Sequence, residues 1–161
     1  MTRSNLEKNK VLPNFELLST DGTKVTNQSI METNAVFFLY PKNNTPTCTN
    51  EAISFSDNIE KFKMLKILVF GVSVNSIKSH KNFITKHSLN LTLLSDQEHQ
   101  FIESMGAWVE KKMYGNTYLG TERTTILVEK SNKIIKVWRN VKVSGHVDEV
   151  LDFGKKSLTN N

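Results

Sequence analysis

The 161-residue sequence predicts an α/β fold with a parallel strand pair at its centre. Two nearly unbroken apolar runs, at 35–40 and 66–74, have the length of strands that are covered on both faces. Between them, residues 47–65 place apolar side chains three and four positions apart, as an amphipathic helix does. A strand, a helix and a second buried strand form a right-handed parallel crossover unit. The chain length suits one domain with a core that holds without disulfides.

The N-terminal part of the sequence predicts a lead-in followed by an edge hairpin. Residues 1–10 are polar and mixed in charge, and we expect a flexible lead-in to a single domain that spans 11–158. Apolar side chains at 15–18 approach a Thr-Asp-Gly-Thr turn signal at 20–23, and Val25 follows it. This pattern is typical of two short antiparallel strands.

Helices and short strands alternate through the middle of the chain. An amphipathic helix over 77–87 begins after Ser76, which suits an N-cap, and a short strand follows at 91–94. A second, shorter helix over 98–105 ends at a glycine. Residues 106–120 show no clear period and predict a long surface loop.

The C-terminal part predicts a second hairpin and a closing helix. Apolar strands at 124–129 and 133–139 flank a Lys-Ser-Asn turn. An amphipathic helix over 145–158 completes the domain, with its apolar residues on one face.

Charge and hydropathy argue against nucleic-acid and membrane partners. The net charge is +5, but the lysines are scattered among acidic residues rather than gathered in one basic patch. No signal-peptide pattern opens the sequence, and no stretch approaches the ~18 apolar residues of a membrane span. The four histidines are far apart, without ligand spacing, so we expect no metal site and no cofactor. These observations predict a soluble cytoplasmic protein.

Cys48 is the only cysteine in the sequence. An intrachain disulfide and a thiolate zinc site within one subunit are therefore both excluded. Any redox chemistry at this residue must recruit a second thiol from another molecule.

The residues around Cys48 predict a thiol at the start of a helix. Thr45 suits the N-cap, and Pro46 suits the first helical position, where its missing N–H is not needed. Cys48 then lies in the first turn, where unpaired amide N–H groups and the helix dipole favour the thiolate over the thiol. The dipole supplies only about 0.3–2 kcal/mol, so a nearby cation is the natural second contributor.

The pattern Pro41-x-x-x-Thr45-x-x-Cys48 resembles the active-site signature of the peroxiredoxins. The longer segment 40–52 is similar to the bacterioferritin comigratory protein, or peroxiredoxin Q, branch. Further motifs of that branch follow in the expected order along nearly the whole chain: Asp21-Gly22, 91–96, Gly106-x-Trp108, 112–115 and 122–125.

The resemblance implies a thioredoxin-like three-layer sandwich, with a central mixed sheet flanked by helices, and a peroxidase activity. By this analogy Cys48 is the peroxidatic nucleophile, which attacks hydrogen peroxide or an organic hydroperoxide and becomes a sulfenic acid. Thr45 would offer its hydroxyl to the peroxide, and Pro41 would shield the thiolate from water. Arg123 would hydrogen-bond both the sulfur and the substrate oxygen. Glu51 would lie at the same helix end and orient Arg123.

Each of these residues also has a structural interpretation. Pro41 would end a strand, Thr45 would cap a helix, Arg123 would form a surface ion pair, and Glu51 would be a solvated first-turn carboxylate. Their joint occurrence favours the functional interpretation.

One position departs from the pattern of the branch. Many members carry a resolving cysteine five residues after the peroxidatic one, where this chain has Ile53. The resemblance therefore implies a one-cysteine cycle, in which thioredoxin, glutaredoxin or a small thiol reduces the sulfenic acid. It favours a monomer and leaves a dimer open.

Three other functions compete with the peroxidase. A dithiol oxidoreductase needs Cys-x-x-Cys, but Thr45 occupies the first position, and a cysteine hydrolase needs a histidine base that no motif places. A peroxide sensor or redox interaction protein would use the same cysteine without turnover. Only repeated cycles with a thiol reductant distinguish this sensor from the enzyme.

Overall fold

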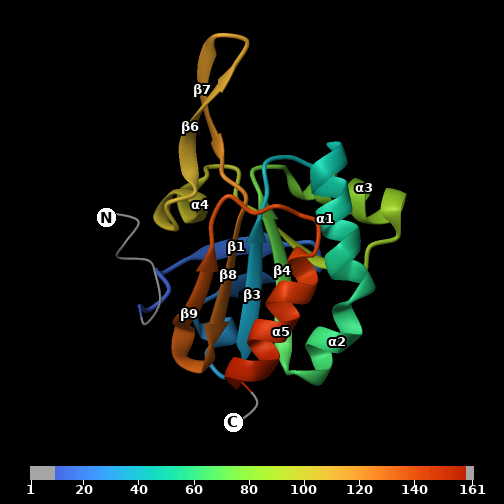
Figure 1. Ribbon diagram of the computed structural model, residues 1–161, viewed down its shortest axis with the longest axis vertical. Helices are drawn as coiled ribbons and strands as arrows, with labels where there is room; N and C mark the ends of the chain where they lie inside the picture. The colour runs from blue at the N-terminus through green and yellow to red at the C-terminus, as the bar shows by residue number, and fades with distance from the viewer. Residues whose placement is uncertain (1–9, 159–161) are drawn as a thin grey trace.

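The computed structural model describes residues 10–158, so most of the expected lead-in at 1–10 lies outside the described residues. Its centre is a seven-stranded mixed sheet in the order β2-β1-β5-β4-β3-β8-β9 (Figure 1). The strands of this sheet are β1 (Glu16–Ser19), β2 (Lys24–Thr26), β3 (Asn34–Leu39), β4 (Ile67–Ser73), β5 (Thr92–Ser95), β8 (Thr124–Glu129) and β9 (Lys133–Trp138). β3 pairs in parallel with β4 and antiparallel with β8, which confirms the predicted parallel unit and the mixed sheet.

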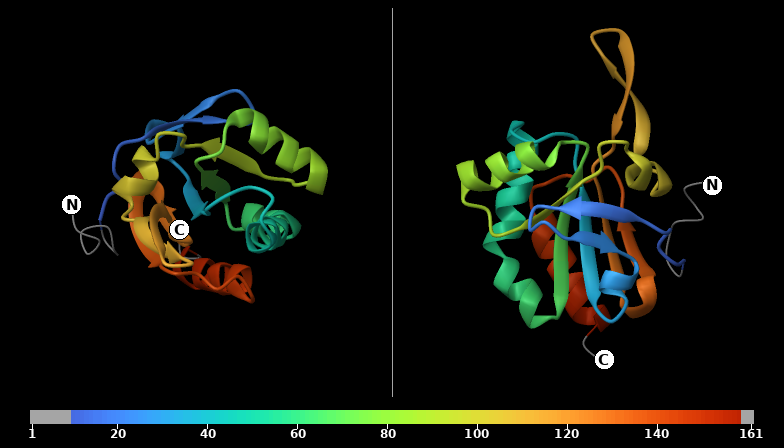
Figure 2. Two further views of the ribbon diagram at one scale, coloured as in Figure 1. Left: turned by 90° about the horizontal axis from the view of Figure 1, so that it is seen from above. Right: turned by 180° about the vertical axis from the view of Figure 1, so that it is seen from behind.

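Helices cover both faces of the sheet (Figures 1 and 2). One face packs against α1 (Pro46–Asp57), α2 (Ile59–Met64), α3 (Ile77–His87) and α5 (His146–Leu158). The other face packs against η2 (Gln28–Ile30) and α4 (Gln100–Ser104). This is the three-layer sandwich that the family resemblance implies, and the edge hairpin of β1 and β2 is in the place that the sequence predicts.

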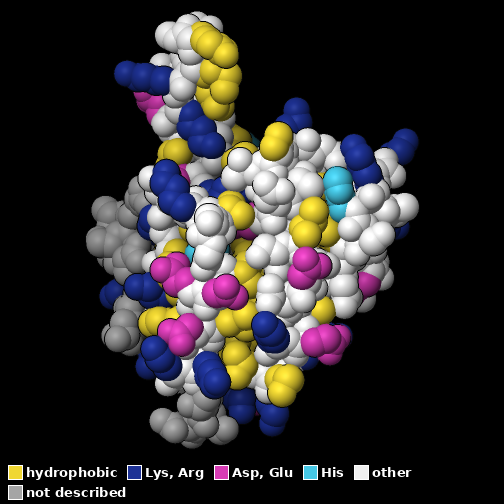
Figure 3. Space-filling view, turned by 45° about the vertical axis from the view of Figure 1, so that its right-hand side comes forward, with side chains coloured by type: hydrophobic (Ala, Val, Ile, Leu, Met, Phe, Trp, Pro, Cys, Tyr) yellow, Lys and Arg dark blue, Asp and Glu magenta, His cyan; other side chains and the backbone are white. Residues whose placement is uncertain are grey.

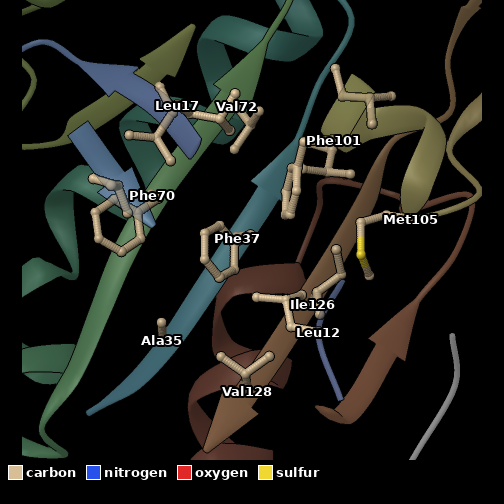
Figure 4. Packing of buried hydrophobic residues seen from close by; sticks show 14 of the residues in the cluster. Leu12, Leu17, Ala35, Phe37, Phe70, Val72, Phe101, Met105, Ile126 and Val128 are labelled. Carbon is tan, nitrogen blue, oxygen red and sulfur yellow. The ribbon is translucent and has the colours of Figure 1, made fainter. Parts of the chain in front are cut away.

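Each face has its own apolar core, because alternate side chains of the central strand β3 point to opposite sides. Phe37 lies in the first core with Phe70 and Phe101, at ring centroid distances of 5.4 and 5.5 Å (Figure 4). Phe38 lies in the second core and stacks on Phe55 of α1 at 4.3 Å. All six residues of β3 are buried, as the apolar run predicts.

The expected helix over 47–65 is two helices, because the chain bends at Asn58. The Asn58 side-chain amide donates to the Ser54 carbonyl oxygen at 2.8 Å, which offers the backbone an alternative to continued helix. The bend between α1 and α2 brings Phe62 into the second core beside Phe55, at a centroid distance of 5.8 Å.

The prediction of a surface loop at 106–120 is wrong. These residues form a two-stranded hairpin of β6 (Trp108–Met113) and β7 (Asn116–Thr121). Tyr114 and Gly115 form its turn with φ of 51° and 80°, as a two-residue primed turn requires. The hairpin projects from the body of the molecule (Figure 1). Most of its side chains are exposed on both faces, so the sequence lacks the alternation that reveals a half-buried strand.

The other elements follow the sequence closely. α3 has the predicted bounds, and the Ser76 hydroxyl accepts a hydrogen bond from Ser79 N at 3.1 Å, as an N-cap does. α4 is shorter than the expected helix over 98–105, and the Asp96 carboxylate accepts from Ile102 N at 2.8 Å. Within residues 10–158, no helix is both long enough and apolar enough to span a membrane.

Candidate active site

The candidate site lies where β3 leads through residues 40–45 into α1, at the end of the sheet from which the hairpin β6–β7 projects (Figure 1). β3 is buried on both faces and fixes the start of this segment. α1 packs on the same sheet through Ala52 and Phe55, which fixes its end. The first turn of α1 is therefore held by two elements of the core.

Cys48 occupies the first turn of α1, as predicted. Thr45 is the N-cap residue and Pro46 begins the helix. The first intrahelical hydrogen bond runs from Thr49 N to Thr45 O at 2.9 Å, so the amides of Thr47 and Cys48 precede it. The Cys48 side chain is enclosed in the second core, and the residue is only 2% exposed. The sulfur thus lies at the positive end of the helix dipole, nearly shielded from water.

Arg123 reaches this sulfur from the segment between β7 and β8. Its Nη2 donates a hydrogen bond to Cys48 Sγ at 3.2 Å. Its Nη1 donates to Glu51 Oε1 at 2.6 Å, in a contact that is largely shielded from water. The structure therefore brings together Cys48, Glu51 and Arg123, three of the candidate residues. Arg123 is 75 residues from Cys48 and 72 residues from Glu51 along the chain.

Glu51 is fully buried rather than solvated, which excludes the structural interpretation of this residue as an exposed first-turn carboxylate. Within the described part of the chain, its second oxygen, Oε2, has no hydrogen-bond partner. Burial raises the pKa of Glu51 to about 7, although the Arg123 guanidinium opposes this shift.

Thr45 and Pro41 border the site but do not contact the sulfur through a hydrogen bond. The Thr45 hydroxyl donates to the Lys42 carbonyl oxygen at 3.0 Å and does not accept a hydrogen bond from the helix amides, as a capping side chain would. Since its one donor is engaged, this hydroxyl offers acceptor lone pairs to a ligand. Pro41 follows β3 after one intervening residue, Tyr40, and is half-buried.

The sequence analysis missed a neutral hydrogen-bond network behind this segment. Tyr40 donates its hydroxyl to Asn43 Oδ1 at 2.6 Å, and Asn43 Nδ2 lies 3.0 Å from His80 Nδ1. His80 Nε2 lies 2.9 Å from the Leu94 carbonyl oxygen and donates to it, because a carbonyl can only accept. His80 Nδ1 is then the acceptor for Asn43, so the network ties the active-site segment to α3 and β5.

The position of the usual resolving cysteine lies on the same helix as Cys48. Ile53 is half-buried there and packs against the second core. Within residues 10–158, no group of three or more His, Cys, Asp and Glu side chains is arranged to hold a metal ion.

The AhpC/TSA family matches residues 9–137 of the chain. The chain belongs to this family. Peroxiredoxin Bcp of Bacillus subtilis (strain 168) is 40% identical over 146 residues, which cover 91% of the chain and 93% of that protein. Peroxiredoxin Bcp of Escherichia coli (strain K12) is 35% identical over 151 residues, which cover 94% and 97%. This AhpC/TSA protein is therefore a peroxiredoxin of the bacterioferritin comigratory protein branch.

Solved structures agree with this assignment. The structure of Xanthomonas campestris peroxiredoxin Q superposes on this chain with a TM-score of 0.85 and 35% sequence identity. The match covers 89% of this chain and 91% of the Xanthomonas chain. Peroxidoxin BcpB of Mycobacterium tuberculosis has a TM-score of 0.81 at 24% identity, over 94% and 97%, and supports the fold. Membership of this family makes the chain a thiol-dependent peroxidase with a peroxidatic cysteine.

Proposed function

We propose that Cys48 reduces hydrogen peroxide and organic hydroperoxides and is oxidised to a sulfenic acid in the same step. The observation that supports this proposal most strongly is the hydrogen bond of Arg123 Nη2 to Cys48 Sγ at 3.2 Å, at the start of a helix. A related Xanthomonas campestris protein has been solved in a ligand complex and described by its alkyl peroxide reduction activity.

The attack forms one bond and breaks one. The Cys48 thiolate forms the S–O bond, the peroxide O–O bond breaks, and the distal oxygen leaves as water or an alcohol once it has taken a proton. Negative charge moves from the sulfur to the leaving oxygen, so a donor that reaches both atoms stabilises the transition state. The guanidinium of Arg123 has N–H groups beyond those on Cys48 and Glu51, and its planar fork suits this role.

Thr45 and Pro41 complete the proposed site. The hydroxyl of Thr45 accepts a hydrogen bond from the peroxide, because its own proton is donated to the Lys42 carbonyl oxygen. Pro41 covers the sulfur side of the pocket with a ring that carries no N–H donor. Both contacts orient the peroxide before the attack and exclude water from the sulfur.

The second half of the cycle belongs to an external thiol, since the sequence contains one cysteine. A first thiolate attacks the sulfenic sulfur and releases water, which leaves a mixed disulfide. A second thiol of the reductant then breaks this disulfide and returns Cys48 to the thiolate. Thioredoxin, glutaredoxin and small thiols are the candidate reductants, and the reducing cytoplasm is the expected location.

A peroxide sensor is the second candidate, favoured by the burial of the sulfur. Cys48 is 2% exposed, so a reductant or a second Cys48 reaches it only when the start of α1 opens. A chain that reacts with peroxide but is not recycled by any thiol would act as a sensor. We expect a monomeric enzyme, because this burial also disfavours an intersubunit Cys48 disulfide.

Stopped-flow mixing with hydrogen peroxide tests the proposed function. Wild type should lose its thiolate in one fast phase and gain one oxygen atom by mass spectrometry, whereas Cys48→Ser should do neither. Ile53→Ala, on the same helix, is the matched control and should keep the fast phase. A wild-type thiol that reacts no faster than free cysteine would refute the assignment of Cys48.

A further inference from the structure

Two acids share a single guanidinium at the candidate site. Arg123 donates to Cys48 Sγ through Nη2 and to Glu51 Oε1 through Nη1, at 3.2 and 2.6 Å. If both acids were ionised, two negative charges would face one positive charge in a buried site. The free-energy cost of burying an unpaired charge is several times that of burying a neutral acid.

The unpaired oxygen lies on Glu51. Its carboxyl group is fully buried, and Oε2 has no hydrogen-bond partner within the described residues. Hydrogen bonds to the ionised form are what lower the pKa of a buried carboxyl, and Oε2 receives none, so the carboxylate is poorly stabilised in this position. Burial accordingly raises the pKa of Glu51 to about 7 despite the attraction of Arg123.

The other titratable groups around the pair do not supply the missing charge. Tyr40 is neutral, since burial raises its pKa and its hydroxyl donates to Asn43. His146 of α5 is buried near Phe55, and burial lowers its pKa while the partner Glu149 opposes the shift. Lys111 of β6 interacts electrostatically with Arg123 and Cys48 but also with Glu122, and it stands half-exposed, where water screens its charge.

We propose that Glu51 holds one proton while Cys48 is a thiolate and gives this proton up when the sulfur becomes neutral. Arg123 then faces a single negative charge before and after oxidation, first on the sulfur and afterwards on the carboxylate. Glu51 is thus a positioning residue that acts through Arg123, and its charge changes during the cycle. This proposal rests on the thiolate chemistry of Cys48 in the proposed function.

The overall reaction balances with this proton. With hydrogen peroxide, a Cys48 thiolate and a Glu51 carboxylic acid give a Cys48 sulfenic acid, a Glu51 carboxylate and water. Sulfur is oxidised, the peroxide oxygens are reduced, and the net charge of the site is unchanged. No proton is taken from solution in this step, so the rate of oxidation does not depend on a proton donor in the solvent.

Proton release on alkylation tests this linkage without peroxide. Iodoacetamide converts the thiolate to a neutral thioether and releases iodide, a step that by itself liberates no proton. In weakly buffered solution, at a near-neutral pH where ultraviolet absorbance shows the thiolate, wild type should release up to one proton per chain as Glu51 ionises, in proportion to the fraction of Glu51 that is protonated before alkylation. Glu51→Gln should release none, and Glu60→Gln, at an exposed position, should match wild type.

Two outcomes overturn the proposal. If wild type releases no proton while its absorbance shows full thiolate, the protonation of Glu51 does not respond to the charge of the sulfur and the linkage does not exist. If Glu51→Gln also releases one proton from full thiolate, another group holds the proton. Neither outcome depends on the reaction with peroxide, so a chain that fails as a peroxidase still reports on this pair.

A second measurement avoids any change at Glu51. The infrared difference spectrum of reduced wild type minus Cys48→Ser, at neutral pH, should show the carbonyl stretch of one protonated carboxylic acid in the wild type only. Serine removes the competing anion, so Glu51 ionises against Arg123 in that variant. The proposal fails if the band is present in both proteins or in neither.

Discussion

Two buried polar clusters border the segment that joins β3 to α1, and they differ in charge and in pairing. On one side, Tyr40, Asn43 and His80 form a neutral network whose hydrogen bonds end on the Leu94 carbonyl oxygen. On the other side, Cys48 and Arg123 form a charged cluster with Glu51, in which one carboxyl oxygen is unpaired.

The difference separates positioning from chemistry. A neutral network in which each member has a hydrogen-bond partner fixes the geometry of its side chains. Each lost hydrogen bond would leave a buried polar group without a partner, at a cost in free energy. A charged cluster with an unpaired oxygen has a protonation state that responds to its neighbours. In the proposed mechanism, the first cluster holds the segment at 40–45 in place, and the second stabilises the charge that moves during the reaction.

The largest expected effect is at Arg123. Arg123→Met should slow the reaction with hydrogen peroxide by about 10²–10³-fold, the usual cost of removing one donor to a developing oxyanion. Arg123→Lys keeps the positive charge but loses the planar guanidinium. Its rate with hydrogen peroxide should therefore lie between the rates of wild type and Arg123→Met. Stopped-flow rates measure both, and equal rates for Arg123→Lys and wild type would refute the bidentate role.

The next effect is a pH dependence of stability that Glu51 controls. Its pKa is 4.5 as an ordinary carboxyl and about 7 in the folded chain. Between these values the folded state binds the proton and the unfolded state does not, so the free energy of unfolding falls as pH rises. At ~1.4 kcal/mol per pKa unit, the fall is on the order of 2–3 kcal/mol.

Urea unfolding at several pH values measures this contribution as the difference between wild type and Glu51→Gln. The variant should lack the fall, so its stability relative to wild type should increase from pH 4.5 to 7. His80 has the opposite effect, since burial lowers its pKa to about 4, and it acts equally in both proteins. A difference that does not change with pH would contradict the raised pKa of Glu51.

The neutral network should contribute less to rate and more to folding. Asn43→Ala strands His80 Nδ1 and the Tyr40 hydroxyl, and should lower the free energy of unfolding by about 1–3 kcal/mol. The peroxide reaction of the folded variant should slow by less than that of Arg123→Met. Lys42→Ala, at an exposed neighbouring position, is the control and should leave both unchanged. An Asn43→Ala chain slower than Arg123→Met would reverse the division of roles.

The smallest expected effect is on the hairpin β6–β7. Its side chains Met113, Tyr114 and Leu119 are 54%, 97% and 60% exposed, and apolar groups gather along one side of it (Figure 3). Met113→Thr with Leu119→Thr should change the free energy of unfolding by less than about 0.5 kcal/mol, as exposed substitutions do. Thermal unfolding checks this, and a large loss would show that the hairpin packs on the body.

The sequence predicts the helices and strands whose own residues show a periodic pattern of apolar side chains. It does not predict the elements that lack such a pattern or that depend on contacts with distant residues. β3 and α3 have strong apolar patterns, and both form where expected. The bend at Asn58 depends on one side-chain hydrogen bond, and the hairpin β6–β7 lacks a buried face. Neither feature leaves a periodic signal in the sequence.

The same distinction applies to the site. The helix start around Cys48 follows from Thr45 and Pro46, which are its neighbours in sequence. Arg123 lies 75 residues away, and only the family resemblance connects it to the sulfur. Asn43 and His80 are 37 residues apart, and no sequence pattern around either residue predicts their contact.

Turnover with an external thiol tests the central claim most directly, because it requires both halves of the proposed cycle. Wild type at catalytic concentration should consume many equivalents of hydrogen peroxide with thioredoxin and its reductase, or with glutathione, and should remain free of intersubunit disulfide. Cys48→Ser should consume none. A wild-type chain that reacts once and then stops with every thiol supplied would contradict the enzyme and favour the sensor.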